Sequence, residues 1–96
     1  RNFAKDELFG MTSQLRRAAL SVPLNIIECF ARISRQDHRR FLEISLGSVN
    51  EAKYLVYFSF EQEYISKNDK EDLLNAGDEI SRMLWKKIET LRRDKM

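Results

Sequence analysis

The fold is decided by residues 8–33, LFGMTSQLRRAALSVPLNIIECFARI. When these residues are projected at 100° each, many apolar side chains fall within about a third of a helix circumference. Such a core stripe is typical of a helix that packs against other helices. The stripe comprises Leu8, Met11, Leu15, Ala18, Ala19, Val22, Ile26, Cys29, Phe30 and Ile33.

Pro23 lies inside this stretch. A proline in a helix interior removes one backbone hydrogen bond and normally costs about 3 kcal/mol. The apolar period nevertheless continues across it, which favours one kinked helix over two helices. A break at residues 21–23 is the alternative, because the residue before a proline avoids the helical region.

A second, narrower apolar strip runs along nearly the opposite side of the same helix. We expect another helix or another subunit to cover this outer strip, because a monomeric surface helix is polar at such positions. The outer strip is the candidate oligomer interface, and its residues are Phe9, Leu20, Leu24 and Ile27.

A polar line separates the two apolar surfaces. Its spacings of three and four residues place it on one ridge, where a hydrogen-bond network is a candidate. Glu28 and Arg32 within it are most simply a helix ion pair. The line consists of Gln14, Arg17, Ser21, Asn25, Glu28 and Arg32.

Further along the chain, Ser34 and Asp37 form a capping box for a second helix that runs to about Ile65. A strip of small side chains in this helix predicts close contact with a neighbour, which would also explain Gly47. We expect a loop at residues 66–69, with Asn68 or Asp69 capping a third helix. The small residues are Ser45, Ser48, Ala52 and Ser59, and the core line of the third helix is Leu74, Ser81, Leu84, Ile88 and Leu91.

The chain therefore predicts an all-α protein, with three long helices and short connections in an up-down bundle. Its 96 residues suit a single domain over 1–96. Three glycines and one proline argue against a sandwich or barrel of short strands.

Six arginines lie between residues 14 and 40, where only Glu28 and Asp37 oppose them. Arginine suits bidentate recognition of phosphate, so contact with a nucleic-acid backbone is one interpretation. A solvated face with intersubunit ion pairs is the alternative, and it is favoured because no aromatic residues interleave the arginines to stack bases. Trp85, beside the core line of the last helix, is interpreted as a packing residue. The arginines are Arg16, Arg17, Arg32, Arg35, Arg39 and Arg40.

Motifs of catalysis and metal binding are not found in the sequence. One cysteine and one histidine exclude a disulfide framework and a Cys-based zinc site. Glu28 and His38 would need to share a cleft to act together, and Cys29 on the core stripe is interpreted as a buried hydrophobe. We expect no enzymatic activity, no metal and no cofactor. No run approaches the length of about 20 apolar residues that crosses a bilayer, and residues 1–6 lack a secretory pattern, so a cytoplasmic location is expected.

Three runs of the sequence resemble a known family: FAKDELFGMTSQLRRAA at 3–19, SVPLNIIE at 21–28 and RRFLEISLGS at 39–48. They are similar to the bacterial four-helix bundle proteins encoded in 23S rRNA intervening sequences. That family usually has Pro where Ala4 stands, and Ala and Gly at Ile27 and Cys29.

The resemblance implies a further helix upstream of Phe3, which would fit the outer strip, and a ring-shaped homo-oligomer, a pentamer. It also implies kinship with accessory proteins of diversity-generating retroelements, which bind a reverse transcriptase and nucleic acid. Our leading hypothesis is a non-enzymatic oligomeric bundle that binds RNA or a nucleic-acid-processing protein through an arginine-rich face. The alternative is a structural protein–protein adaptor without nucleic-acid contact, in which the outer strip carries the partner.

Overall fold

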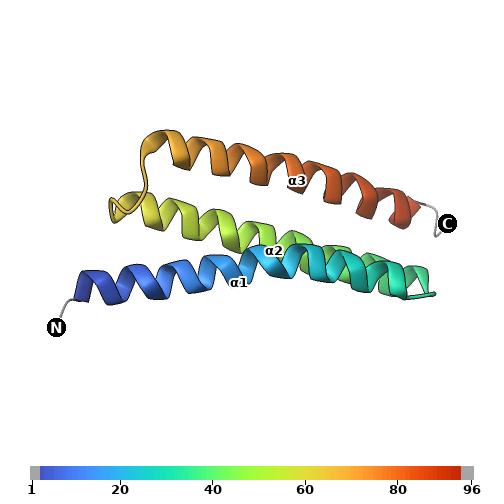
Figure 1. Cartoon of the computed structure of the whole chain (residues 1–96). Helices are drawn as coiled ribbons and strands as arrows, with labels where there is room; N and C mark the ends of the chain where they lie inside the picture. Colours follow the sequence, from blue (N-terminus) through green and yellow to red (C-terminus); the bar gives the residue numbers. More distant parts are fainter. Residues whose placement is uncertain (1–2, 94–96) are drawn as a thin grey trace.

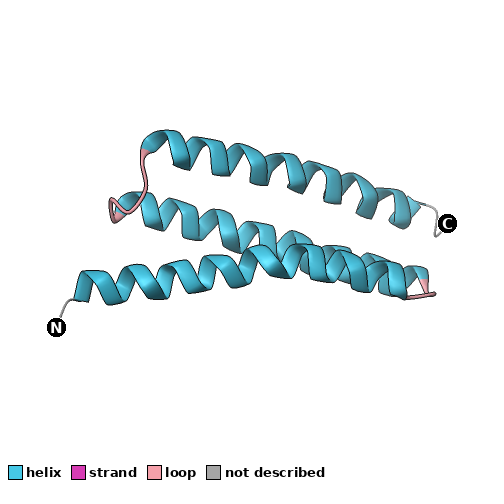
Figure 2. Ribbon diagram, in the orientation of Figure 1, coloured by secondary structure: helices cyan, strands magenta, loops and turns pink. Residues whose placement is uncertain are grey.

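The computed structural model describes residues 3–93, with side chains from residue 5 onward. Three helices account for almost all of this range, which contains no strand (Figures 1 and 2). They are α1 (Phe3–Ala31), α2 (Arg35–Glu61) and α3 (Lys67–Arg93). The prediction of an all-α protein with three long helices and short connections is confirmed.

α1 is one helix of 29 residues with Pro23 inside it. The continuous apolar period thus predicted the outcome correctly, and the alternative break at residues 21–23 is wrong. The missing bond at Pro23 is tolerated because packing, rather than local propensity, supplies most of the stability of a helix in a protein.

The turn between α1 and α2 is held by the predicted cap. Ser34 has extended backbone angles (φ −70°, ψ 134°), and its side chain accepts a hydrogen bond of 3.3 Å from the Asp37 amide. His38 Nε2 is hydrogen-bonded to the Arg32 carbonyl oxygen, which ties α2 back to the chain that enters it. α1 and α2 therefore meet in a short, closed turn.

α2 ends at Glu61, four residues before the predicted end at Ile65. The Glu63 amide donates to the Phe60 carbonyl and the Tyr64 amide to the Ser59 carbonyl, the bonding pattern of a Schellman motif. Glu63 takes a positive φ of 62° there. The end was missed because glycine usually occupies this position.

The start of α3 also differs from the prediction. The connecting segment covers residues 62–66, and Ser66 rather than Asn68 or Asp69 is the cap, since the Asp69 amide donates to Ser66 Oγ at 3.1 Å. Ser66 and Asp69 repeat the Ser-x-x-Asp spacing of Ser34 and Asp37. Of the predicted loop at 66–69, residues 67–69 already belong to the first turn of the helix.

The three helices form a single layer, about 56 by 25 by 14 Å, with α2 in the middle (Figure 1). α2 packs against both neighbours, whereas no Cα atoms of α1 and α3 lie within 8 Å of each other in the described residues. The core lies along α2 and takes one side from each outer helix. Its buried residues are Cys29, Leu42, Val49, Leu84 and Ile88.

Small residues bring α1 and α2 close together, as predicted. Ser45 is fully buried and donates to the Val22 carbonyl at 3.1 Å, and Ser21 and Ser48 are hydrogen-bonded at 2.8 Å. The explanation of Gly47 by a close approach is wrong, because open space surrounds the position where its Cβ would be.

Several residues of the predicted core stripe are exposed, which corrects that prediction. Leu8 and Phe30 are 42% and 78% exposed, Ile33 is fully exposed, and Ala19 also lies at the surface. The physical reason is the open layer, in which α2 covers only part of the stripe and α3 is not packed directly against α1. Ile33 lies beyond the end of α1, in the turn before α2, so it is not on the helix face.

Candidate functional site

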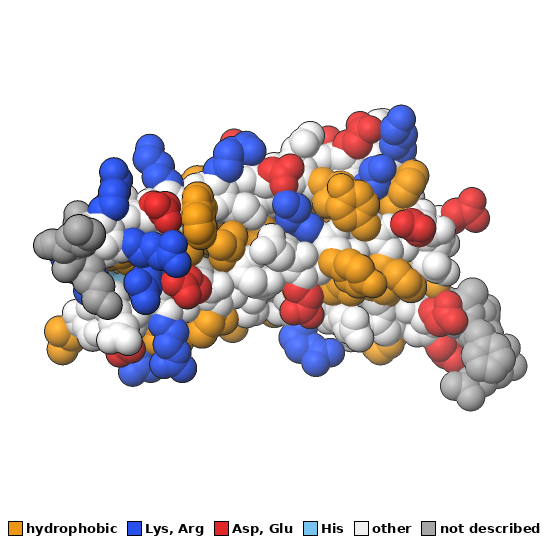
Figure 3. Space-filling view, turned by 180° about the vertical axis from the view of Figure 1, so that it is seen from behind, with side chains coloured by type: hydrophobic (Ala, Val, Ile, Leu, Met, Phe, Trp, Pro, Cys, Tyr) orange, Lys and Arg blue, Asp and Glu red, His pale blue; other side chains and the backbone are white. Residues whose placement is uncertain are grey.

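One end of the layer gathers basic side chains from all three helices. The end of α1, the start of α2 and the end of α3 meet there because the helices run up, down and up. We define the basic end as residues 28–43 and 84–93, which carry eight Lys and Arg side chains against four carboxylates. Lys and Arg side chains also predominate there in the space-filling view (Figure 3). The basic residues are Arg32, Arg35, Arg39, Arg40, Lys86, Lys87, Arg92 and Arg93.

The opposite end carries the opposite charge. Residues 5–10 and 57–72 contain three lysines and seven carboxylates. The chain is therefore strongly polarised along its 56 Å length although its net charge is only +2. Such an asymmetric field attracts a polyanion to one end only.

Arg32 and Arg40 lie over the aromatic ring of Phe41 at the basic end. Their guanidinium carbons lie 5.2 Å and 5.4 Å from the centre of the Phe41 ring, within the range of a cation–π contact. Arg32 also pairs with Glu28 at 2.8 Å, and Arg39 pairs with Glu43 at 3.3 Å. These exposed pairs order the guanidinium groups at the surface while leaving each one partly accessible.

α3 supplies half of the basic side chains of this end, and the sequence analysis did not assign them to the site. Lys86, Lys87, Arg92 and Arg93 are all exposed near its end. Arg92 pairs with Glu89 at 3.3 Å and lies over the Trp85 ring at 5.8 Å. Only the up-down topology brings these residues beside the α1–α2 turn, so no local sequence pattern could have shown it.

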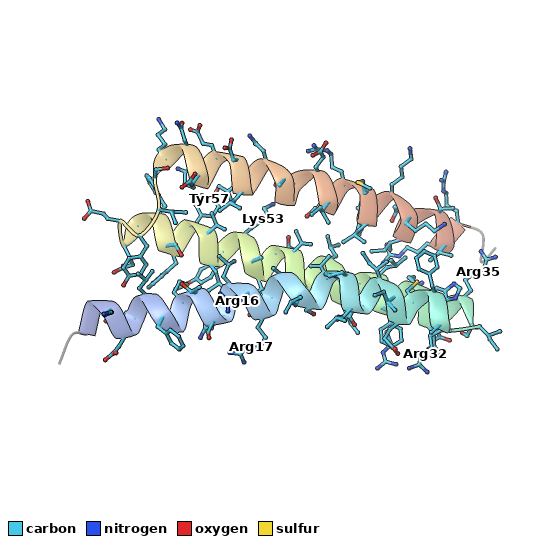
Figure 4. All side chains as sticks on the ribbon, in the orientation of Figure 1. Arg16, Arg17, Arg32, Arg35, Lys53 and Tyr57 are labelled. Atoms are coloured by element: carbon cyan, nitrogen blue, oxygen red, sulfur yellow. The ribbon has the colours of Figure 1, made fainter. Side chains whose placement is uncertain are left out.

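The structure does not bring Arg16 and Arg17 into the basic end. Figure 4 shows both along α1, well separated from Arg32 and Arg35. Fifteen residues of helix between Arg17 and Arg32 correspond to about 22 Å. Arg16 lines a small recess at the start of α1, and Arg17 lines a polar recess between α1 and α2.

The polar line of α1 divides into three pairs of residues. Asn25 donates to the Ser21 carbonyl and hydroxyl at 2.8 Å and 3.0 Å, and Ser21 continues to Ser48 of α2. Glu28 and Arg32 form a separate ion pair. The remaining members, Gln14 and Arg17, line the polar recess beside Ser21.

An apolar groove of about 550 Å³ runs along one face of the layer between α1 and α3, with α2 as its floor. Its walls include Ala19 and Ile26 of α1 and Ile80 and Met83 of α3. Met83 is 69% exposed and Ile80 is 39% exposed.

The outer strip of α1 is separate from this groove. Phe9, Leu20, Leu24 and Ile27 are between 55% and 75% exposed, and none of them lines the groove. The chain therefore has two distinct apolar surfaces. The expectation that a further helix covers the outer strip stays a prediction.

Each of the residues considered for catalysis has a bonding partner or is buried. Glu28 pairs with Arg32, and His38 is bonded to the Arg32 carbonyl. Cys29 is buried, as expected from the core stripe, and burial raises the pKa of its thiol. Within the described residues, no cluster of three or more His, Cys, Asp or Glu could hold a metal ion, and no helix is long and apolar enough to cross a membrane.

The fold and its surfaces define a class of protein: an open layer of three antiparallel helices with an uncovered groove and one basic end. The chain belongs to the family of 23S rRNA-intervening sequence proteins, whose model matches residues 1–86. The resemblance noted in the sequence is thus confirmed.

A solved structure is similar to this chain. It is a protein of unknown function from the S23 ribosomal protein family of Bacteroides thetaiotaomicron, 32% identical, with a TM-score of 0.79. The similarity covers 81% of this chain and 72% of that one. No curated protein matches this chain.

Proposed function

We propose that the protein is a non-enzymatic, oligomeric helical bundle that binds RNA through its basic end. The observation that carries the proposal is the convergence of eight Lys and Arg side chains from three helix ends, with four carboxylates among them. Half of these cations are arginines in residues 28–43, whose guanidinium groups suit phosphate oxygens. The acidic opposite end directs a polyanion away from the remaining length of the layer.

Oligomerisation would strengthen this field. A symmetric ring repeats the basic end in every subunit, so several weak phosphate contacts add along one RNA. The exposed outer strip supports assembly through α1, because four large apolar side chains on one ridge gain by leaving water. A ring, and a pentamer in particular, is what the family resemblance implies.

The apolar groove supports the four-helix architecture that the family resemblance implies. We propose that it seats a fourth helix, since its lining is almost entirely apolar and is contributed by all three helices. The similar solved structure has enough additional chain for such an element, because 28% of that chain lies outside the match.

A structural adaptor without RNA contact is the second candidate function, and the outer strip is the observation that favours it. In that case Leu20 and Leu24 carry the contact to a protein partner. Leu20→Asp or Leu24→Asp would then abolish partner assembly, while arginine substitutions would leave it intact.

The test of RNA binding is a titration of a labelled rRNA fragment at several salt concentrations. We expect affinity to fall steeply with salt, and charge reversal at Arg32, Arg35 and Arg39 to abolish binding. The matched control is charge reversal at Arg16 and Arg17, which lie outside the basic end and should reduce affinity much less. An RNA affinity that does not change with salt concentration would contradict the proposal. Equal losses of affinity from the two sets of charge reversals would also contradict it.

A further inference from the structure

We infer that the basic end binds single-stranded nucleic acid, with Trp85 as the surface on which a base stacks. This inference rests on the proposed function, because the surrounding cations supply the attraction for the phosphates. It adds what those cations alone do not provide, a preference for unpaired over paired nucleotides.

Trp85 lies within the cationic cluster. It is 49% exposed and is followed directly by Lys86 and Lys87. Arg92, two turns further along α3, places its guanidinium carbon 5.8 Å from the centre of the indole ring. A half-exposed indole leaves a large apolar surface in water, and stacking of a base would cover it.

Phe41 provides a second aromatic group at the same end, from a different helix. Arg32 and Arg40 both lie over its ring. Bases stack on arginine planes as well as on aromatic rings, so the guanidinium planes over this half-buried ring are surfaces that suit a base. The expectation that no aromatic residues interleave the arginines overlooked Phe30, which stands between Arg17 and Arg32, and the fold adds Trp85 from α3.

The geometry favours a single strand over a duplex. In a double helix the base faces are already stacked on one another, so Trp85 could contribute nothing to duplex affinity without unstacking a base pair. In an unpaired strand the faces are available, and a few phosphates can contact the neighbouring lysines and arginines. The layer measures only 25 by 14 Å across, so its end suits a short stretch of strand.

The simpler role for Trp85 is packing against α2, and selectivity separates the two roles. A packing residue changes stability but affects all polyanions alike. A stacking residue changes affinity for unpaired strands and leaves duplex and polyphosphate binding almost unchanged. Trp85 is the sole tryptophan of the chain, so its fluorescence reports directly on this site.

The experiment titrates the protein with a short oligouridylate, a duplex RNA of equal length and inorganic polyphosphate at low salt. We expect oligouridylate to quench Trp85 fluorescence strongly and polyphosphate to bind with little quenching. Trp85→Leu should weaken oligouridylate binding by roughly tenfold without changing polyphosphate binding. Trp85→Phe keeps a ring and should recover most of the affinity.

The control is Tyr54→Leu, which removes an exposed aromatic side chain of α2 outside the basic end and should change none of the affinities. Equal quenching by all three polyanions, or equal oligouridylate binding by Trp85→Leu and the unaltered protein, would overturn the stacking inference. Salt-sensitive binding would still support the electrostatic proposal in that case. If Trp85→Leu does not fold, the quenching pattern of the unaltered protein decides. If none of the three polyanions binds in a salt-sensitive way, both proposals are overturned.

Discussion

At the scale of single residues, Lys53 and Asp78 connect α2 to α3. Their side chains form an ion pair of 2.5 Å, and Figure 4 places Lys53 between the two helices. The hydrogen bond from Lys53 lowers the pKa of Asp78, and the charges of Lys53 and Arg82 act in the same direction. These residues are 25 positions apart, so no local pattern in the sequence predicts the pair.

The lowered pKa of Asp78 predicts a pH dependence of stability. A carboxyl group whose pKa is lower in the folded state stabilises that state above its ordinary value of 3.8 and loses this contribution as pH falls through the folded value. We expect the free energy of unfolding to decline as pH falls from about 5. Lys53→Met should flatten the part of this decline that belongs to Asp78.

Urea unfolding at a series of pH values measures this effect. Lys86→Met is the matched control, because it removes a lysine that lies away from Asp78. A Lys53→Met protein with the same acid slope as the unaltered chain would show that the pair does not contribute to folding.

The glycines give a second prediction at this scale. A Cβ at Gly77 would lie 2.9 Å from Cγ of Lys53, whereas Gly47 has open space. Gly47→Ala should therefore raise the free energy of unfolding by up to about 1 kcal/mol through helix propensity. Gly77→Ala should gain less or lose stability, because the Lys53 stem must move and the ion pair with Asp78 is disturbed.

Thermal unfolding of the two alanine variants compares them directly. Combining Gly77→Ala with Lys53→Ala removes the clash and should restore the propensity gain. Equal stabilisation by Gly47→Ala and Gly77→Ala would contradict the close approach.

At the scale of helices, the sequence predicted the existence of each helix better than the residues at which it begins and ends. Ser34 and Asp37 form the predicted cap of α2. The continuous apolar period correctly predicted that α1 is one helix with Pro23 inside it. The end of α2 was missed because its left-handed residue is Glu63, where glycine is the usual marker. The start of α3 was misplaced because Asn68 and Asp69 are themselves good caps and stand close behind Ser66.

The left-handed backbone at Glu63 predicts a stabilising substitution. Glu63 has φ 62°, a conformation that costs a residue with a Cβ roughly 1 kcal/mol or more. Glu63→Gly should stabilise the protein by about 0.5–1 kcal/mol, since glycine adopts this conformation without the steric cost.

Glu63→Ala is the control, because it removes the same charge but keeps the Cβ. We expect chemical denaturation to rank Glu63→Gly above Glu63→Ala. If both variants gain equally, the benefit would come from removing a carboxylate at the acidic end, and the strain at Glu63 would be insignificant.

At the scale of the whole molecule, the sequence predicted the class of fold but not which surfaces the packing leaves open. Projection of the sequence placed Phe30 and Ile33 on a core stripe. Phe30 remains exposed because α3 is not packed directly against α1, and Ile33 because α1 ends before it, at Ala31. The same limit applies to the candidate site. Arg32, Arg39 and Arg40 are neighbours in sequence and were grouped correctly, whereas α3 joins them only through topology.

The two apolar surfaces give the last prediction, which concerns assembly. If the outer strip joins subunits and the groove seats a helix, Leu24→Asp should reduce the sedimenting mass of the oligomer, while Ile80→Asp should leave it unchanged. Both substitutions place a carboxylate on an exposed apolar position of a helix, so each controls for the other. Sedimentation velocity at several protein concentrations measures the mass. Dissociation by Ile80→Asp alone, with the helical circular dichroism of the chain unchanged, would assign the groove to a second copy of the chain.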